Sequence, residues 1–209
     1  MTALQSDRPP EQADHWQQRV DLALAFRWAA RLNLHEAVAN HFSVAVGDGH
    51  ACVLRDNHTI WCFGRADSGQ VGPNGNREFC TDMVTRCLPA ATQVSRLEFA
   101  TLAAGAEHTC AIKAGESSTV FCWGKNNHGQ TDGNAGGISA ISQPTAVGLP
   151  GGETAKSLAL GRLHTCALTT TGGVRCWGNN EDHQIISAQE GLAELSTGKS
   201  ATCVLDANQ

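Results

Sequence analysis

The sequence GAEHTCAIKAGESSTVFCWGKNNHGQTD, residues 105–132, holds the clearest pattern in this chain of 209 residues. It runs from a Gly to His-x-Cys, then through a polar break to Cys-Trp-Gly and finally to Gly-Gln. The same order recurs at residues 47–72 and 161–186, and residues 198–209 begin a fourth copy. Recurrence of one unit along a chain predicts a repeat architecture, in which each copy packs against its neighbours.

Equivalent positions in successive copies give the length of one unit. Cys166 and Cys203 are 37 residues apart, whereas His50, His108 and His164 follow one another at intervals of 58 and 56 residues. The sequence therefore predicts a unit of about 37 residues, with insertions in the first two copies.

Two short apolar runs flank a polar break in each copy, which is the pattern of a β-hairpin. The predicted hairpins join residues 51–54 to 59–63, 109–112 to 119–123 and 165–168 to 174–177. A further apolar run at residues 99–102 and at 157–160 predicts another strand in a unit. Abundant Gly (22 residues) and few charged residues (17%) also favour a turn-rich β protein.

Glycines at fixed places predict special backbone geometry. The Gly after each aromatic residue, at Gly64, Gly124 and Gly178, is expected in a tight turn with unusual backbone angles. Gln follows Gly in the first two copies, but His183 precedes Gln184 in the third. A distorted turn is expected there.

Composition excludes several classes of function. The formal net charge of −5 argues against a general nucleic-acid-binding surface, and no apolar run approaches the roughly 20 residues that cross a bilayer. Residues 1–16 lack the apolar core of a secretion signal. Nine cysteines, however, are typical of an oxidising compartment. These two indications disagree, so the localisation stays open.

Eight of the nine cysteines are expected in disulfides. The members of a pair are 10, 12 or 10 residues apart in the three copies, and this even difference keeps both cysteines on one face of a hairpin. Opposed residues of antiparallel strands lie within disulfide distance. The predicted pairs are Cys52 with Cys62, Cys110 with Cys122, Cys166 with Cys176 and, across an insertion, Cys80 with Cys87. Cys203 is left alone.

Zinc binding is the alternative use of the His-x-Cys motifs. Zinc motifs place paired ligands two to four residues apart on tight turns, whereas here the second Cys lies across a hairpin. The repeated His is therefore predicted to make a structural hydrogen bond between units, and the Trp residues to fill space between them. No nucleophile has an evident base, so neither catalysis nor a metal or cofactor is expected.

With these residues in view, the chain from residue 47 to 209 resembles the cysteine-bearing form of regulator of chromosome condensation repeats. The resemblance rests on the motifs Gly-x-x-His-x-Cys-Ala-Leu, Cys-Trp-Gly-x-Asn and Gly-Gln. That resemblance implies β-propeller blades of four strands, commonly seven in a closed ring. It also implies a binding surface, because members include nucleotide-exchange partners of small GTPases and a secreted β-lactamase inhibitor.

Residues 1–46 are predicted to form a separate helical segment, with a helix over residues 11–32. Residues 12–46 resemble the N-terminus of the class II aldolase/adducin family, most clearly in LALAFRWAARLNLHEAVANHFSVAV at residues 22–46. The resemblance would make His41 and Ser43 contacts to a substrate's anionic group. That family holds its divalent metal with a His-x-His pair, which this sequence lacks. Aldolase-like activity is therefore not expected.

The predicted fold is mainly β, a partial, open β-propeller of three blades and a fragment, preceded by the N-terminal α-helix. The propeller repeats are placed at residues 47–72, 105–132, 161–186 and, in part, 198–209 within a domain of residues 47–209. The predicted function is a protein-interaction module, with self-association through the open propeller ends because terminal repeats need capping. Two alternatives stay open, a class II aldolase/adducin-like metal-dependent enzyme fragment and a chimeric or truncated chain without an evolved joint function.

Overall fold

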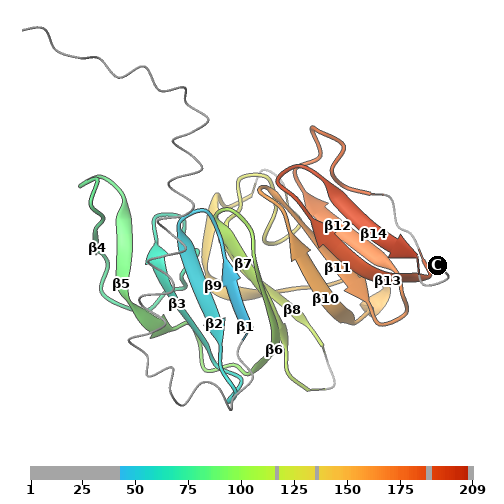
Figure 1. Ribbon diagram of the computed structural model, residues 1–209, viewed down its shortest axis with the longest axis horizontal. Helices are drawn as coiled ribbons and strands as arrows, with labels where there is room; N and C mark the ends of the chain where they lie inside the picture. The colour runs from blue at the N-terminus through green and yellow to red at the C-terminus, as the bar shows by residue number, and fades with distance from the viewer. Residues whose placement is uncertain (1–42, 116–117, 135–136, 187–189, 207–209) are drawn as a thin grey trace, which may run out of the picture. The chain divides into compact units, whose positions relative to one another are not determined.

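The computed structural model describes residues 43–115, 118–134, 137–186 and 190–206 (Figure 1). Within these ranges the chain forms four antiparallel sheets and one short 3₁₀ helix, η1 (Pro150–Gly152). No helix of the described part is long and apolar enough to cross a bilayer. The predicted helix over residues 11–32 and His41 lie outside the described residues.

The first two sheets contain the predicted hairpins together with outer strands. The first has the strand order β1-β2-β3-β5-β4, made of β1 (Ser43–Val46), β2 (His50–Leu54), β3 (Ile60–Arg65), β4 (Glu78–Phe79) and β5 (Arg86–Gln93). The second has the order β6-β7-β8-β9, made of β6 (Phe99–Ala104), β7 (His108–Lys113), β8 (Val120–Lys125) and β9 (Ala140–Val147). Strand β1 precedes Gly47, where the repeat domain was predicted to begin.

The third and fourth sheets have fewer strands. The third has the order β10-β11-β12, made of β10 (Ala155–Leu160), β11 (His164–Thr169) and β12 (Val174–Gly178). The fourth pairs β13 (Leu192–Thr197) with β14 (Thr202–Asp206). Contacts between β1 and β6, β6 and β10, and β10 and β13 show that the first strand of each sheet lies next to the first strand of the following sheet.

A disulfide joins the second and third strands of each of the first three sheets. Cys52 is the register partner of Cys62, and the equivalent pairs in the next sheets are Cys110 with Cys122 and Cys166 with Cys176. The Cα atoms of each pair are 4.1 Å apart, which is close to the spacing of a non-hydrogen-bonded pair. The even sequence spacing thus corresponds to a shared face of the hairpin.

Each hydrophobic core lies between two adjacent sheets. Between the first and second sheets, Trp123 is fully buried and Phe99 packs edge-on against Phe121, with ring centroids 6.0 Å apart. Similar clusters join the second sheet to the third and the third to the fourth. The burial of apolar side chains therefore stabilises the stack of sheets as well as each hairpin.

The Gly after each aromatic residue lies in or at the end of a strand, so the predicted tight turn is wrong. Gly64, Gly124 and Gly178 have φ values of 99°, 110° and 106°. Gly64 and Gly124 coincide with register shifts against the outer strand, as expected for β-bulges. A Cβ on Gly64 would lie 2.6 Å from the Gly49 carbonyl oxygen. The unusual backbone angles were predicted correctly, and the bulge explains them.

A second set of glycines sets how closely neighbouring sheets approach. A Cβ on Gly47 would lie 2.4 Å from the carbonyl oxygen of Gly105, and one on Gly105 would lie 2.5 Å from that of Gly161. The same contact from Gly161 to Gly198 is 2.9 Å. Any larger residue at these positions would push the sheets apart.

We expect Gly105→Ala to lower the free energy of unfolding by about 1–3 kcal/mol, because its methyl group would overlap the Gly161 carbonyl and the His108 ring. Gly148→Ala is the matched control, since a Cβ there meets no atom within 4 Å, and should change stability by less than about 0.5 kcal/mol. Denaturant unfolding measures both. Equal effects of the two substitutions would contradict the close-approach argument.

Candidate functional site

The repeated histidines are buried between sheets and hydrogen-bonded across them. His50 lies 2.8 Å from the hydroxyl of Thr109 in the next sheet, measured from Nε2 to Oγ1, and the Thr109 hydroxyl donates to the backbone carbonyl of Gln70 at 3.1 Å. Because that hydroxyl has one hydrogen, it accepts from Nε2–H of the histidine. The equivalent chains are His108–Thr165–Gln130 and His164–Thr202–Gln184.

Tryptophan extends the same hydrogen-bond chain. The Nε1–H of Trp123 donates to the Gln70 carbonyl at 2.9 Å, and that of Trp177 donates to the Gln130 carbonyl at 3.1 Å. In the third turn His183 adopts φ of 56°, near the 74° of Gly129, so the Gln184 carbonyl keeps its position. The expectation of a distorted third turn was wrong.

These histidines are neutral at physiological pH. Burial lowers the pKa of His50 to about 4 and that of His108 to about 3, with smaller contributions to His108 from the neighbouring His50 and His164. Burial also lowers the pKa of His164. Each Nδ1 is buried without a hydrogen-bond partner. Within the described ranges, no group of three His, Cys, Asp or Glu side chains has metal-binding geometry. The repeated His and Trp residues thus link neighbouring sheets, and the repeated Cys residues join strands within a sheet.

A different part of the first sheet projects apolar side chains into solvent. Strands β4 and β5 form a hairpin (green in Figure 1), whose end we call the hairpin tip and define as residues 79–87. Phe79 is 51% exposed, Met83 73% and Val84 81%. Only four other large apolar residues of the described chain are exposed, and they lie on β1, β14 and the segment before β9. The hairpin tip is therefore the main concentration of exposed apolar surface in the described residues.

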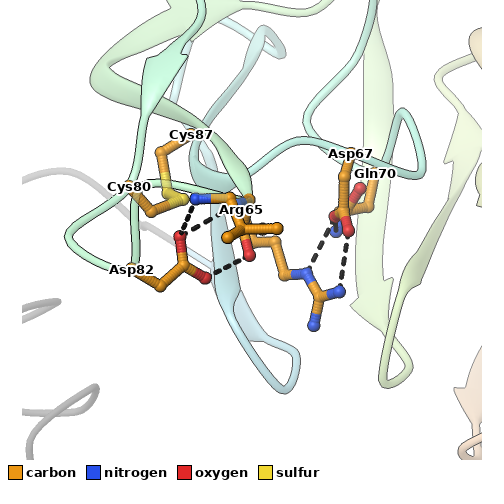
Figure 2. Close-up of a disulfide and its surroundings, with 8 residues drawn as sticks. Arg65, Asp67, Gln70, Cys80, Asp82 and Cys87 are labelled. Carbon is orange, nitrogen blue, oxygen red and sulfur yellow. Dashed lines mark hydrogen bonds and ion pairs between the residues drawn. A yellow bond between two sulfur atoms is a disulfide. The ribbon is translucent and has the colours of Figure 1, made fainter.

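Hydrogen bonds fix the shape of the hairpin tip. The Cys80 amide donates to the Thr85 carbonyl at 2.8 Å, and the Met83 amide to the Cys80 carbonyl at 3.0 Å. Asp82 accepts from the amides of Val84 and Thr85 at 2.9 and 2.8 Å, and from the Thr85 hydroxyl (Figure 2). The bond from Thr85 leads the causes that hold the pKa of Asp82 below its ordinary value. Met83 adopts a positive φ of 56°.

A disulfide and a cation hold the base of the hairpin tip. Cys80 is bonded to Cys87, with their Cα atoms 5.2 Å apart (Figure 2). Cys87 is also the register partner of Arg65 on β3, which ties the hairpin tip to the sheet. The Arg86 guanidinium lies over the Phe79 ring, 3.9 Å from its centroid, and so orients that ring.

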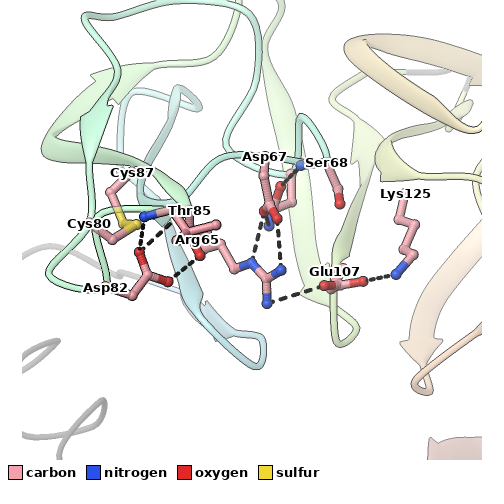
Figure 3. A network of polar contacts seen from close by, with 11 residues as sticks. Arg65, Asp67, Ser68, Cys80, Asp82, Thr85, Cys87, Glu107 and Lys125 are labelled. Carbon is pink, nitrogen blue, oxygen red and sulfur yellow. Dashed lines mark hydrogen bonds and ion pairs between the residues drawn. A yellow bond between two sulfur atoms is a disulfide. The ribbon is translucent and has the colours of Figure 1, made fainter.

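Beside the hairpin tip, a row of charges links the first sheet to the second (Figure 3). Arg65 makes a bidentate contact to Asp67, with distances of 2.8 and 2.7 Å, and lies 3.4 Å from Glu107. Glu107 in turn pairs with Lys125. Burial alone would raise the pKa of Asp67, but hydrogen bonds from Arg65 and Gln70 outweigh it and lower the pKa. The signs alternate, so this row carries no excess of positive charge.

Of the two residues predicted as anion contacts, the structure describes one. Ser43 is exposed on β1, opposite Leu54, and His41 lies outside the described residues. Sequence reasoning missed the hairpin tip, although it paired Cys80 with Cys87. The available signal was the string CTDMVTRC at residues 80–87, in which two cysteines enclose adjacent apolar residues in a polar insertion.

Comparison with known proteins supports the repeat architecture. Residues 43–70, 99–130 and 155–184 match the Regulator of chromosome condensation (RCC1) repeat. The chain is 28% identical over 145 residues to the ultraviolet-B receptor UVR8 of Arabidopsis thaliana, a match covering 68% of this chain and 30% of the receptor. It is 30% identical over 152 residues to the secretion-regulating guanine nucleotide exchange factor of Bos taurus, covering 69% of this chain and 30% of that protein.

A solved structure shows the same fold. Prp20p from Saccharomyces cerevisiae superposes with a TM-score of 0.66 at 18% sequence identity, covering 80% of this chain and 42% of that one. The prediction of a mainly β, open, partial propeller is thereby confirmed. The chain spans about 30% of the length of the two curated relatives. The comparisons lend no support to the resemblance of residues 12–46 to the class II aldolase/adducin family.

Acid should weaken the contact between sheets, because the histidine pKa values are lower in the folded chain than in the unfolded one. The unfolded chain then binds more protons, so the free energy of unfolding should fall as the pH drops from about 6.5 towards 4. The loss for His50 alone is at most about 3 kcal/mol. Denaturant unfolding of the oxidised protein at several pH values measures it.

His108→Gln is the informative variant for this measurement. Its amide can still donate to Thr165, but it does not titrate, so the pH dependence between 6.5 and 4 should become shallower than in the unsubstituted protein. An unchanged slope would mean that His108 does not contribute to the acid sensitivity.

Proposed function

Because the chain is built from Regulator of chromosome condensation (RCC1) repeats, we propose that it acts as a protein-interaction module. The hairpin tip is its main contact surface. The observation that carries this proposal is the exposure of Phe79, Met83 and Val84 on a turn whose backbone is fixed by hydrogen bonds and a disulfide. The partner that binds this surface is a folded protein with an apolar pocket that accepts the Met83 and Val84 side chains.

Pre-organisation supports this assignment. An apolar side chain on a flexible loop loses conformational entropy when it binds, whereas a side chain on a fixed turn loses less. Asp82 satisfies the amides of Val84 and Thr85 and the Thr85 hydroxyl, so the polar groups of the turn need no partner from outside. What the turn offers to another molecule is therefore apolar surface, in an arrangement set before binding.

Charge favours a protein over nucleic acid or a lipid surface. The hairpin carries Glu78 and Asp82 as well as Arg77 and Arg86, and the neighbouring row alternates between Arg65, Asp67, Glu107 and Lys125. Phosphate backbones and anionic membranes are bound by clustered Lys and Arg, which neither surface presents. A pocket of apolar side chains with a mixed polar rim is the complementary surface.

The repeat by itself does not select a partner. The two curated relatives are named as a receptor and as an exchange factor, although both share the repeat with this chain. In the described residues, the hairpin formed by β4 and β5 occurs in the first sheet and has no counterpart in the second. The choice of partner is therefore assigned to this insertion, while the repeated residues stabilise the sheets that carry it.

The test is a photo-reactive side chain placed at position 83 in one variant and at position 138 in another, in the cells that express the protein. Ile138 is 69% exposed but distant in sequence from the hairpin tip, which makes it the matched control. We expect a protein that cross-links from position 83 and not from position 138. The identified partner is then titrated by calorimetry.

Met83→Asp and Val84→Asp should each weaken that binding by at least about tenfold, because a carboxylate would enter an apolar pocket. Ile138→Asp should leave the affinity unchanged. Circular dichroism and denaturant unfolding check that all three variants are folded. Full affinity of the Met83→Asp and Val84→Asp variants would exclude the hairpin tip as the contact surface, and cross-linking from position 138 alone would move it elsewhere.

A further inference from the structure

We propose that the Cys80–Cys87 disulfide is a redox latch, which a dithiol reductant opens while the buried disulfides of the first two sheets stay intact. Opening of the latch needs no partner protein. Only its effect on binding rests on the proposed function.

Solvent access differs sharply between them. Cys52, Cys62, Cys110 and Cys122 are all 0% exposed, in cores that lie between neighbouring sheets. Cys166 is also fully buried, and its partner Cys176 is partly exposed. Both Cys80 and Cys87 are partly exposed, on a hairpin that projects from the first sheet. A thiolate must reach a sulfur atom to attack it, so the exposed pair is the first target.

The reaction is a thiol–disulfide exchange. A thiolate of the dithiol attacks the sulfur of Cys80 or Cys87, the bond between these two sulfurs breaks, and the displaced sulfur leaves as a thiolate. The second thiol of the reductant then attacks the mixed disulfide and releases the other cysteine. Two electrons pass to the protein, which gains two thiols, and the dithiol becomes a cyclic or intramolecular disulfide.

Few contacts would hold β4 and the turn after this step. Strand β4 has only two residues, Glu78 and Phe79, paired with Cys87 and Arg86. Strand β5 stays paired with β3 at Cys87 and Arg65, and the Ala66 amide still donates to the Arg86 carbonyl at 2.7 Å. The bonds around Asp82 close the turn but do not tie β4 or the turn to β3. Opening the disulfide therefore frees the positions of Phe79, Met83 and Val84 and leaves the stack of sheets in place.

The first measurement is a titration of the oxidised protein with dithiothreitol. Thiols are trapped with iodoacetamide and located by mass spectrometry, and the exposed, free Cys203 serves as the internal reference for complete alkylation. We expect Cys80 and Cys87 to be labelled at a dithiothreitol concentration at least about tenfold below that needed for Cys52, Cys62, Cys110 and Cys122. Simultaneous opening of all four disulfides, or earlier opening of a buried one, would overturn the latch.

The second measurement is hydrogen exchange of the amides of residues 78–85. Exchange should be at least about tenfold faster in the selectively reduced protein and in Cys80→Ser/Cys87→Ser than in the oxidised protein, while amides of β2 and β7 stay unchanged. Unchanged exchange in the hairpin after selective reduction would also overturn the latch, since the disulfide would then hold nothing.

Binding to the partner identified by cross-linking separates the two proposals. If selective reduction loosens the hairpin and weakens binding at least about fivefold, both stand. If it loosens the hairpin and the affinity does not change, the latch stands as a chemical property and the assignment of the hairpin tip as the contact surface fails.

Discussion

The structure depends on a hydrogen-bond chain that is repeated between each pair of neighbouring sheets. A buried imidazole donates to a threonine hydroxyl of the next sheet, and that hydroxyl donates to a glutamine carbonyl beside the imidazole's own sheet. The chain forms only because Gly47, Gly105 and Gly161 let neighbouring backbones approach. It also requires an uncharged imidazole, which burial ensures by lowering the histidine pKa values. The hydrogen-bond chain therefore requires close approach of the backbones, a neutral histidine and the apolar cores that bury it, all at once.

Stability and recognition are carried by different residues of the same chain. The repeated His, Cys, Trp and Gln residues point between sheets and leave little of their chemistry to solvent. The insertion between β3 and β5 instead places apolar side chains on a constrained turn outside the stack. Because few contacts link that turn to the stack, it can vary in sequence, or change its redox state, without disturbing the support. This separation explains how one repeat can serve proteins with different functions.

Much of this architecture was predictable from local patterns. The spacing of Cys110 and Cys122, two residues longer than in the other copies, still placed both cysteines on one face, because strand side chains alternate with period two. Apolar runs located the hairpins. The place of Gly64 was mispredicted, since a bulge inside a strand and a turn at its end demand the same positive φ. Similarly, His183 adopts a conformation that was expected only of glycine.

Repetition and strand period were enough to predict an array of β-hairpins and the disulfide register, because both follow from the alternation of side chains along a strand and from the recurrence of one unit. The propeller was predicted from the resemblance of the repeated motifs to a known family. Three-dimensional packing decided the rest. Which threonine meets His50, and that Trp123 contacts the Gln70 carbonyl, depend on residues more than 50 positions apart in the chain. The exposure of Met83 and Val84 likewise follows from where β4 and β5 leave the sheet. Two adjacent apolar residues in the sequence do not by themselves indicate whether another sheet will cover them.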